Sequence, residues 1–273
     1  VLFDGRQILI QAMKLDLVLA ILVATGLLQG ESAGIIEEFD ASLPRTGFVN
    51  MIMTPAELLG QEAANSLNHV LLADQKIEWR MYVPRNYSVA TPPGVLVFIS
   101  SIDWGGIPDE WQPLMDAHNL IWISPGQAGA SAPVQERMIK SILAPRVVDI
   151  DYTVNNERVY IAGFSDGGKV ANLVQAVDPV AFRGGIYMCG ALFWGEKTPA
   201  KLNIMRENRH VFIRACSDPR EREVRGVFDE YRKAGFEGAE LITVQTRRRR
   251  LPEPKYIDQA IRRLDGKVVE GTD

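Results

Sequence analysis

Cysteine and histidine are scarce in this 273-residue chain, which has two cysteines and three histidines. Neither Cys189 nor Cys216 has nearby residues with metal-ligand spacing, so the sequence predicts no metal centre. A net charge of −4, without a basic block over most of the chain, predicts no nucleic-acid partner. Internal repeats and low-complexity segments are absent. The glycine-containing loop 126–129 matches no phosphate-binding fingerprint, so no nucleotide cofactor is expected.

The sequence also lacks an apolar run long enough to cross a bilayer comfortably. Its longest apolar stretch, Leu17–Leu28, follows Lys14 and precedes small residues, which is typical of a secretory signal. We therefore expect a signal peptide over 13–33, preceded by an extension (1–12) before the start methionine. The remaining 34–273 would form a single domain, secreted or periplasmic and free of the membrane after cleavage. An uncleaved N-terminal anchor is the alternative.

Export bears on the two cysteines, because disulfides form in oxidising compartments. Cys189 and Cys216 fall near the ends of two expected neighbouring strands, so a disulfide between them is conceivable. Two buried free thiols are the alternative, which the sequence favours slightly.

Strand and helix patterns alternate through most of the chain. An antiparallel pair is expected first, over 67–72 and 76–83, whereas 34–65 has no clear pattern. Pro145 is expected to break or kink the second helix. Alternation of this kind predicts an α/β fold, with a mainly parallel sheet covered by helices on both faces. The further strands are expected at 95–100, 120–124, 158–162, 185–189, 211–215 and 240–244, and the helices at 108–118, 134–152, 166–177, 219–234 and 254–264.

One stretch carries a chemical motif. A short apolar strand ends in Gly163-Phe164-Ser165-Asp166-Gly167, and a helical pattern follows. Gly-x-Ser-x-Gly in this context is typical of a nucleophile elbow, in which the serine sits on a strained strand-to-helix turn with its hydroxyl exposed. The free N–H groups at the start of the helix would stabilise an anion beside Ser165. An ordinary tight turn is the alternative.

The elbow and its flanks, Val159–Val170, resemble the α/β-hydrolase fold, and more closely the secreted esterases related to polyhydroxybutyrate depolymerases and feruloyl esterases. The resemblance extends over about 76–266. It implies hydrolysis of a small-molecule or polymeric ester through an acyl-serine intermediate, by a serine, an acid and a histidine in that chain order. The sequence leaves the oligomeric state open.

The resemblance places the acid at Asp218, directly after the expected strand 211–215. Asp218 before Pro219 is also a good helix N-cap, and both roles are compatible. The oxyanion hole would use the backbone N–H of Asp166 and a second N–H near Ser101 or Ile102. No His-Gly-Gly signature supports the second assignment.

The triad histidine is missing. The family's His-x-Leu-Pro aligns with Arg249-Arg250-Leu251-Pro252, so Arg249 occupies its position, and no histidine follows Asp218. Arginine stays protonated and offers no acceptor, so it cannot act as the base. The other histidines, His69, His118 and His210, are expected to be structural.

Three interpretations of the arginine run remain open. The chain is an ester hydrolase that is impaired or uses another base, or it is a non-catalytic binding protein whose arginines hold an anion. The third is a sequencing error that rewrote the loop 246–250 as arginines. Four adjacent arginines, 247–250, are also typical of a solvated surface turn.

Overall fold

The structure is a computed structural model that describes residues 44–103, 105–194, 201–215, 221–245 and 250–266. The predicted extension and signal peptide lie outside these residues. Within the described residues, no helix has both the length and the apolar character needed to cross a membrane.

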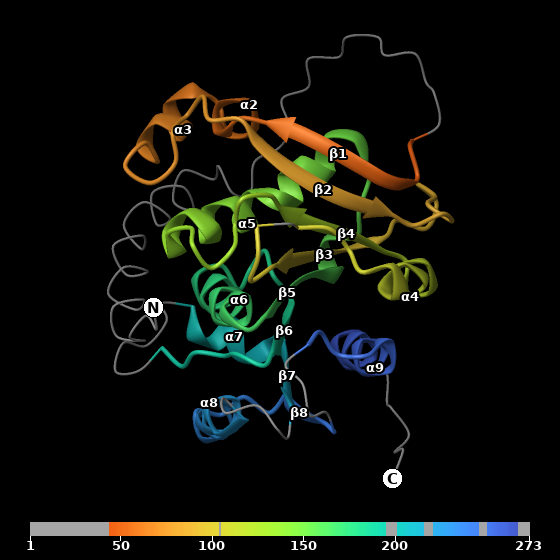
Figure 1. Cartoon of the computed structure of the whole chain (residues 1–273), viewed down its shortest axis with the longest axis vertical. Helices are drawn as coiled ribbons and strands as arrows, with labels where there is room; N and C mark the ends of the chain where they lie inside the picture. The colour runs from red at the N-terminus through yellow and green to blue at the C-terminus, as the bar shows by residue number, and fades with distance from the viewer. Residues whose placement is uncertain (1–43, 104, 195–200, 216–220, 246–249, 267–273) are drawn as a thin grey trace.

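A single eight-stranded sheet runs through the described chain in the order β1-β2-β4-β3-β5-β6-β7-β8 (Figure 1). The pairs from β4 through β3 to β8 are parallel, and β2 is antiparallel to both β1 and β4. The mainly parallel α/β sheet predicted from the sequence is therefore confirmed. The strands are β1 Gly47–Met53, β2 Ile77–Val83, β3 Gly94–Ile99, β4 Leu120–Pro125, β5 Val159–Phe164, β6 Gly184–Met188, β7 Arg209–Ala215 and β8 Ala239–Val244.

Helices cover both faces of the sheet (Figure 1). One face packs against α2 (Pro55–Leu59), α3 (Gln61–Ser66), α5 (Val134–Asp151), α6 (Asp166–Val177), α7 (Leu202–Glu207) and α8 (Glu221–Lys233). The other packs against the 3-10 turn η1 (Asp109–Trp111), α4 (Gln112–His118) and α9 (Pro254–Leu264). A second 3-10 turn, η2 (Asn156–Arg158), leads into β5.

The central strands are buried on both faces, which explains their continuous apolar sequences. In β3, Val95 and Val97 enter the core beneath α5 and α6, whereas Leu96 and Phe98 enter the core beneath α4 and α9. Alternate residues of a strand point to opposite faces, so every position of β3 has an apolar environment.

The predicted opening strand at 67–72 is wrong, because β2 pairs with β1 instead. Leu67 and Leu71 are buried but lie four residues apart, and the amide of Leu71 donates to the carbonyl of Leu67 at 2.9 Å. This is helical-turn spacing rather than strand alternation. Of the break or kink expected at Pro145, the break is wrong, since α5 continues through this residue.

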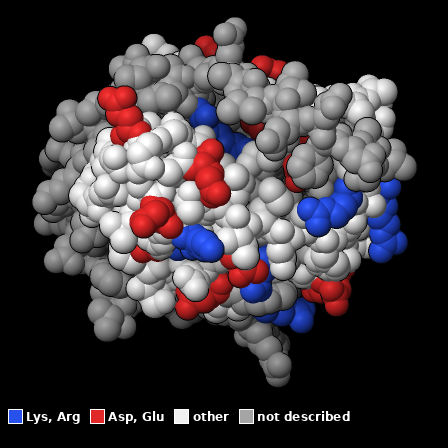
Figure 2. Space-filling model, turned by 90° about the horizontal axis from the view of Figure 1, so that it is seen from above, with Lys and Arg blue, Asp and Glu red and all other residues white. Residues whose placement is uncertain are grey.

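Charged side chains of both signs lie on one face of the molecule, seen in Figure 2. On the face shown in Figure 2, the described acidic and basic residues are interspersed, and neither sign forms a continuous area. The sequence-based expectation that the chain has no nucleic-acid partner stays a prediction.

Candidate active site

Ser165 lies at the turn between β5 and α6. The residue is only 3% exposed, so the exposed hydroxyl expected from the motif is not observed, and Ser165 is buried at the turn. Its backbone has φ 59° and ψ −121°. A non-glycine residue in such a region costs about 1–3 kcal/mol and persists only where its surroundings fix it. Here the amide of Ser165 donates to the carbonyl of Met188 at 2.7 Å, and its carbonyl accepts from the amide of Gly168 at 3.0 Å. The turn therefore has the strained backbone of a nucleophile elbow.

Glycines let this turn approach its neighbours. A Cβ on Gly167 would lie 2.0 Å from the carbonyl oxygen of Ile99, and one on Gly190 would lie 2.0 Å from the carbonyl oxygen of Ser165. Contacts this short exclude any side chain at either position. The first turn of α6 thus rests directly on the end of β3, and the segment after β6 rests on Ser165.

The loop after β3 contains the two residues predicted to supply an oxyanion donor. The amide of Ile102 donates to the hydroxyl of Ser100 at 3.1 Å. The amide of Ser101 has no acceptor among the described residues. Since the carbonyl carbon of Ser100 would lie 3.3 Å from a Cβ on Gly167, this loop adjoins the start of α6, where Asp166 is the first residue. The backbone favours Ser101 over Ile102.

The predicted acid Asp218 and the position of the missing histidine, Arg249, lie outside the described residues. Their flanking elements are described. The strand β7 ends at Ala215, before the acid, and Arg250 follows Arg249 directly. A small pocket at the carboxyl ends of three strands is lined by Cys189, Ala215, Val244 and residues 250–253.

This pocket adjoins the serine. Cys189 separates Met188, which accepts the amide hydrogen of Ser165, from Gly190, which packs on the serine carbonyl. On its far side, the carbonyl of Pro252 accepts from the indole N–H of buried Trp111 at 3.3 Å. Residues 250–253, which lead into α9, are therefore anchored close to the elbow. Cys216 is outside the described residues, so neither the conceivable disulfide nor the slightly favoured pair of free thiols is tested.

A salt bridge joins the elbow helix to the helix that follows the acid loop. The ammonium of Lys169, four residues after Ser165, lies 2.6 Å from a carboxylate oxygen of Glu223 in α8. It links α6 directly to α8.

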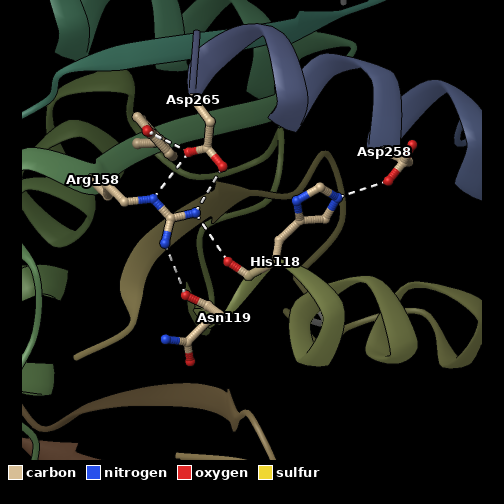
Figure 3. Close-up of polar contacts among 6 residues, drawn as sticks. His118, Asn119, Arg158, Asp258 and Asp265 are labelled. Atoms are coloured by element: carbon tan, nitrogen blue, oxygen red, sulfur yellow. Dashed lines mark hydrogen bonds and ion pairs between the residues drawn. The ribbon is translucent and has the colours of Figure 1, made fainter. Parts of the chain in front are cut away.

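His118 lies near the amino ends of the strands, at the edge opposite Ser165. Its Nε2 is 2.8 Å from Oδ1 of Asp258 in α9 (Figure 3). Nearby, the guanidinium of Arg158 makes two hydrogen bonds of 3.0 Å to the carboxylate of Asp265, and also donates to the carbonyls of His118 and Asn119. These contacts hold the end of α9 against α4 and β5. His118 is structural, as predicted.

His210 is also structural. It is 0% exposed near the start of β7, with Nε2 at 2.9 Å from the carbonyl of Met205 and Nδ1 at 3.0 Å from the hydroxyl of Tyr187. A carbonyl only accepts, so Nε2 carries the proton and Nδ1 accepts from tyrosine. Burial lowers the pKa of His210 to about 4, partly opposed by the Met205 hydrogen bond. With both nitrogens engaged, His210 is not available as a base. His69 is exposed in the turns after α3.

His210 predicts a specific acid sensitivity. Its folded pKa of about 4 is below the unfolded value of 6.5, so its neutral form stabilises the fold above pH 6.5. That contribution, up to about 3 kcal/mol, is lost as pH falls from 6.5 to 4. Urea unfolding of wild type and His210→Gln at pH 7.5, 5.5 and 4.5 checks this. The variant should lose less stability over this range, and His69→Gln should match wild type. An unchanged pH dependence in His210→Gln contradicts the assignment.

Two buried cations on α5 were not identified from the sequence. Arg137 is 2% exposed and Lys140 is 1% exposed, and both donate to carbonyls of the loop 126–130. Their sequence signal is weak, because charged residues three apart on a helix ordinarily face solvent. Within the described residues, no cluster of three His, Cys, Asp or Glu side chains could hold a metal ion.

No protein-family model matches the chain, and no curated protein matches it. Similar solved structures include a thermostable esterase, at 16% identity and TM-score 0.53 over 73% of this chain and 55% of the other. A ferulic acid esterase matches at 12% identity and TM-score 0.57, over 78% and 94% of the two chains. A structure of fungal esterases from Rhizomucor miehei matches at 10% identity and TM-score 0.56, over 90% of each chain.

These similarities show the fold. The chain has the α/β-hydrolase fold, with Ser165 on the turn that follows β5. It spans just over half the length of the thermostable esterase, and most of the other two.

Proposed function

We propose that this chain is a serine hydrolase that acts on carboxylic esters through an acyl-serine intermediate. The observation that carries the proposal is the strained backbone of Ser165, held at the tip of β5 beside the start of α6 and the end of β3. Strained backbone of this kind is concentrated at active sites, ligand clamps and switch regions, where the strain is part of the mechanism. The esterases that share the fold support the same chemistry by analogy.

In the proposed reaction, Oγ of Ser165 bonds to the ester carbonyl carbon while a base takes the hydroxyl proton. The carbonyl oxygen becomes an oxyanion, which the N–H groups of Asp166 and Ser101 stabilise. Collapse of this intermediate breaks the bond to the alcohol, which leaves with a proton, and water then hydrolyses the acyl-serine in the same manner. Asp218 would orient and stabilise a cationic base.

The proposed mechanism lacks an identified general base. His118 and His210 are held at the far edge of the sheet, and Arg249 occupies the expected histidine position. We therefore propose a slow enzyme in which water or another base takes the hydroxyl proton of Ser165. The expected substrates are small-molecule or polymeric esters, and the signal predicted over 13–33 would make the chain secreted or periplasmic.

The run of arginines at 247–250 favours one alternative, an inactive binding protein on the same fold with an Arg-rich anion site. A ligand with a carboxylate or phosphate would bind there, because guanidinium groups recognise such anions bidentately.

Comparing wild type with Ser165→Ala separates the two functions. We expect wild type to hydrolyse p-nitrophenyl acetate at least tenfold faster than Ser165→Ala, and to gain a covalent adduct on Ser165 with a fluorophosphonate probe. Because triad residues act as a unit, the loss is smaller than in an enzyme with its histidine. Equal rates in the two proteins, with no adduct, reject the hydrolase and favour the binding protein.

A further inference from the structure

Arg137 is a buried cation whose hydrogen bonds go to two loops at the candidate site. Its Nε donates to the carbonyl of Ala128 at 2.8 Å, and its Nη2 donates to the carbonyl of Ser100 at 3.0 Å. Burial lowers its pKa to about 10, and the nearby charges of Asp166 and Asp103 oppose this. Arg137 therefore remains charged at neutral pH. A buried charge is costly, so its retention calls for a specific role.

The hydrogen bond to Ser100 fixes the direction of a neighbouring N–H. In a trans peptide, the carbonyl of one residue and the N–H of the next point to opposite sides. Arg137 holds the carbonyl of Ser100 toward α5, so the N–H of Ser101 points away from α5. The carbonyl of Ser101 in turn accepts from the amide of Ala130 at 3.1 Å. Both peptide planes flanking Ser101 are thus fixed.

The two loops are joined by further contacts. The amide of Gln127 donates to the carbonyl of Asp103 at 3.2 Å, and that of Gly129 donates to the Asp103 carboxylate at 3.0 Å. Arg137 contacts both loops from the side of the sheet that α5 covers. Among the described side chains, Arg137 alone donates hydrogen bonds to backbone carbonyls of both loops.

We propose that Arg137 is a positioning residue for the oxyanion hole. It orients the N–H of Ser101 toward the space beside Ser165, and its charge stabilises the negative charge that develops there. This role rests on the proposed function, in which Ser101 and Asp166 donate to the oxyanion. It adds a residue on α5 that lies beneath the reacting groups.

Lys140 is the matched control. It lies one turn along α5, is equally buried, and donates to the carbonyl of Gln127 at 3.0 Å. Its ammonium is paired with Glu136 at 2.7 Å, and it makes no described contact with the loop after β3. Replacing it removes a buried cation and a contact to the loop 126–130, without releasing Ser100.

The test compares Arg137→Lys, Arg137→Met and Lys140→Met with wild type, using p-nitrophenyl acetate and trifluoroacetophenone, a ketone that forms a tetrahedral oxyanion on serine. We expect Arg137→Met to lower kcat by about 10- to 100-fold, to weaken ketone inhibition by a similar factor, and to leave KM within twofold. Arg137→Lys should lose kcat too, because an ammonium cannot bridge both carbonyls in the guanidinium geometry. Lys140→Met should stay within threefold in kcat.

Thermal unfolding identifies the variants that fold. The proposal is overturned if Arg137→Lys or a folded Arg137→Met keeps wild-type kcat and ketone inhibition, or if Lys140→Met loses as much as Arg137→Met. Those outcomes leave the proposed function standing, provided that turnover depends on Ser165. A wild type without Ser165-dependent turnover overturns both.

Discussion

Replacing Arg249 by histidine is expected to raise the rate of Ser165-dependent ester hydrolysis by about 1,000-fold. A guanidinium has no lone pair to accept the serine proton, whereas neutral imidazole accepts it and later returns it to the leaving alcohol. The anchored loop supports the placement, since Pro252, three residues further on, is held by Trp111 and lines the pocket at the ends of β6, β7 and β8. The measurement is kcat for p-nitrophenyl acetate from pH 5 to 9. In Arg249→His, kcat should rise with pH as the new imidazole loses its proton.

Three variants control this experiment. In Ser165→Ala/Arg249→His the gain should vanish, because the imidazole acts only through the serine. Arg248→His places the same side chain one residue away and should gain little. Arg249→Gly should be activated by added imidazole, whereas wild type should not. If Arg249→His gains nothing, or if Arg248→His gains as much, then Arg249 does not occupy the position of a lost base.

The sequence predicted the fold well where the signal is local. The elbow helix is predicted over 166–177 and has those bounds, because the apolar residues after the elbow recur at helical spacing, at Val170, Leu173, Val174 and Val177. The region before β2 was predicted poorly. Phe48 and Ile52 of the edge strand β1 are exposed, so the alternation that identifies a half-buried strand is weak. The apolar residues Leu67 and Leu71 wrongly indicated a strand, because they are buried by a helical turn.

The residues of the candidate site were likewise predictable from sequence only where the signal is local. Ser165 could be found from sequence, since its flanking glycines are required by contacts of the turn itself. Arg137 could not, because its role depends on the carbonyls of Ser100 and Ala128, which only the folded sheet brings to α5. The assignments of Asp218 and Arg249 rest on the order of elements in a resembling family and stay predictions.

Substituting Gly167 by alanine is expected to destabilise the protein by about 3 kcal/mol or more, and to abolish Ser165-dependent turnover in any molecules that still fold. The added Cβ would lie 2.0 Å from the carbonyl oxygen of Ile99 and 2.9 Å from its carbon. Both are backbone atoms of the central strand β3, so no side-chain rotation relieves the clash. Separation of α6 from β3 would also move the N–H groups of Asp166 and Ser101 apart, and a displacement of about 1 Å can cost roughly 100-fold in rate.

Gly226→Ala is the control for this substitution. Gly226 lies inside α8, and a Cβ there would meet nothing within 4 Å. Alanine favours a helix over glycine by about 0.5–1 kcal/mol, so this variant should be slightly more stable than wild type and equally active. Urea unfolding and p-nitrophenyl acetate turnover give both quantities. A Gly167→Ala variant with wild-type stability and rate would mean that α6 does not rest on β3, and the two proposed oxyanion donors would then not face a common space beside Ser165.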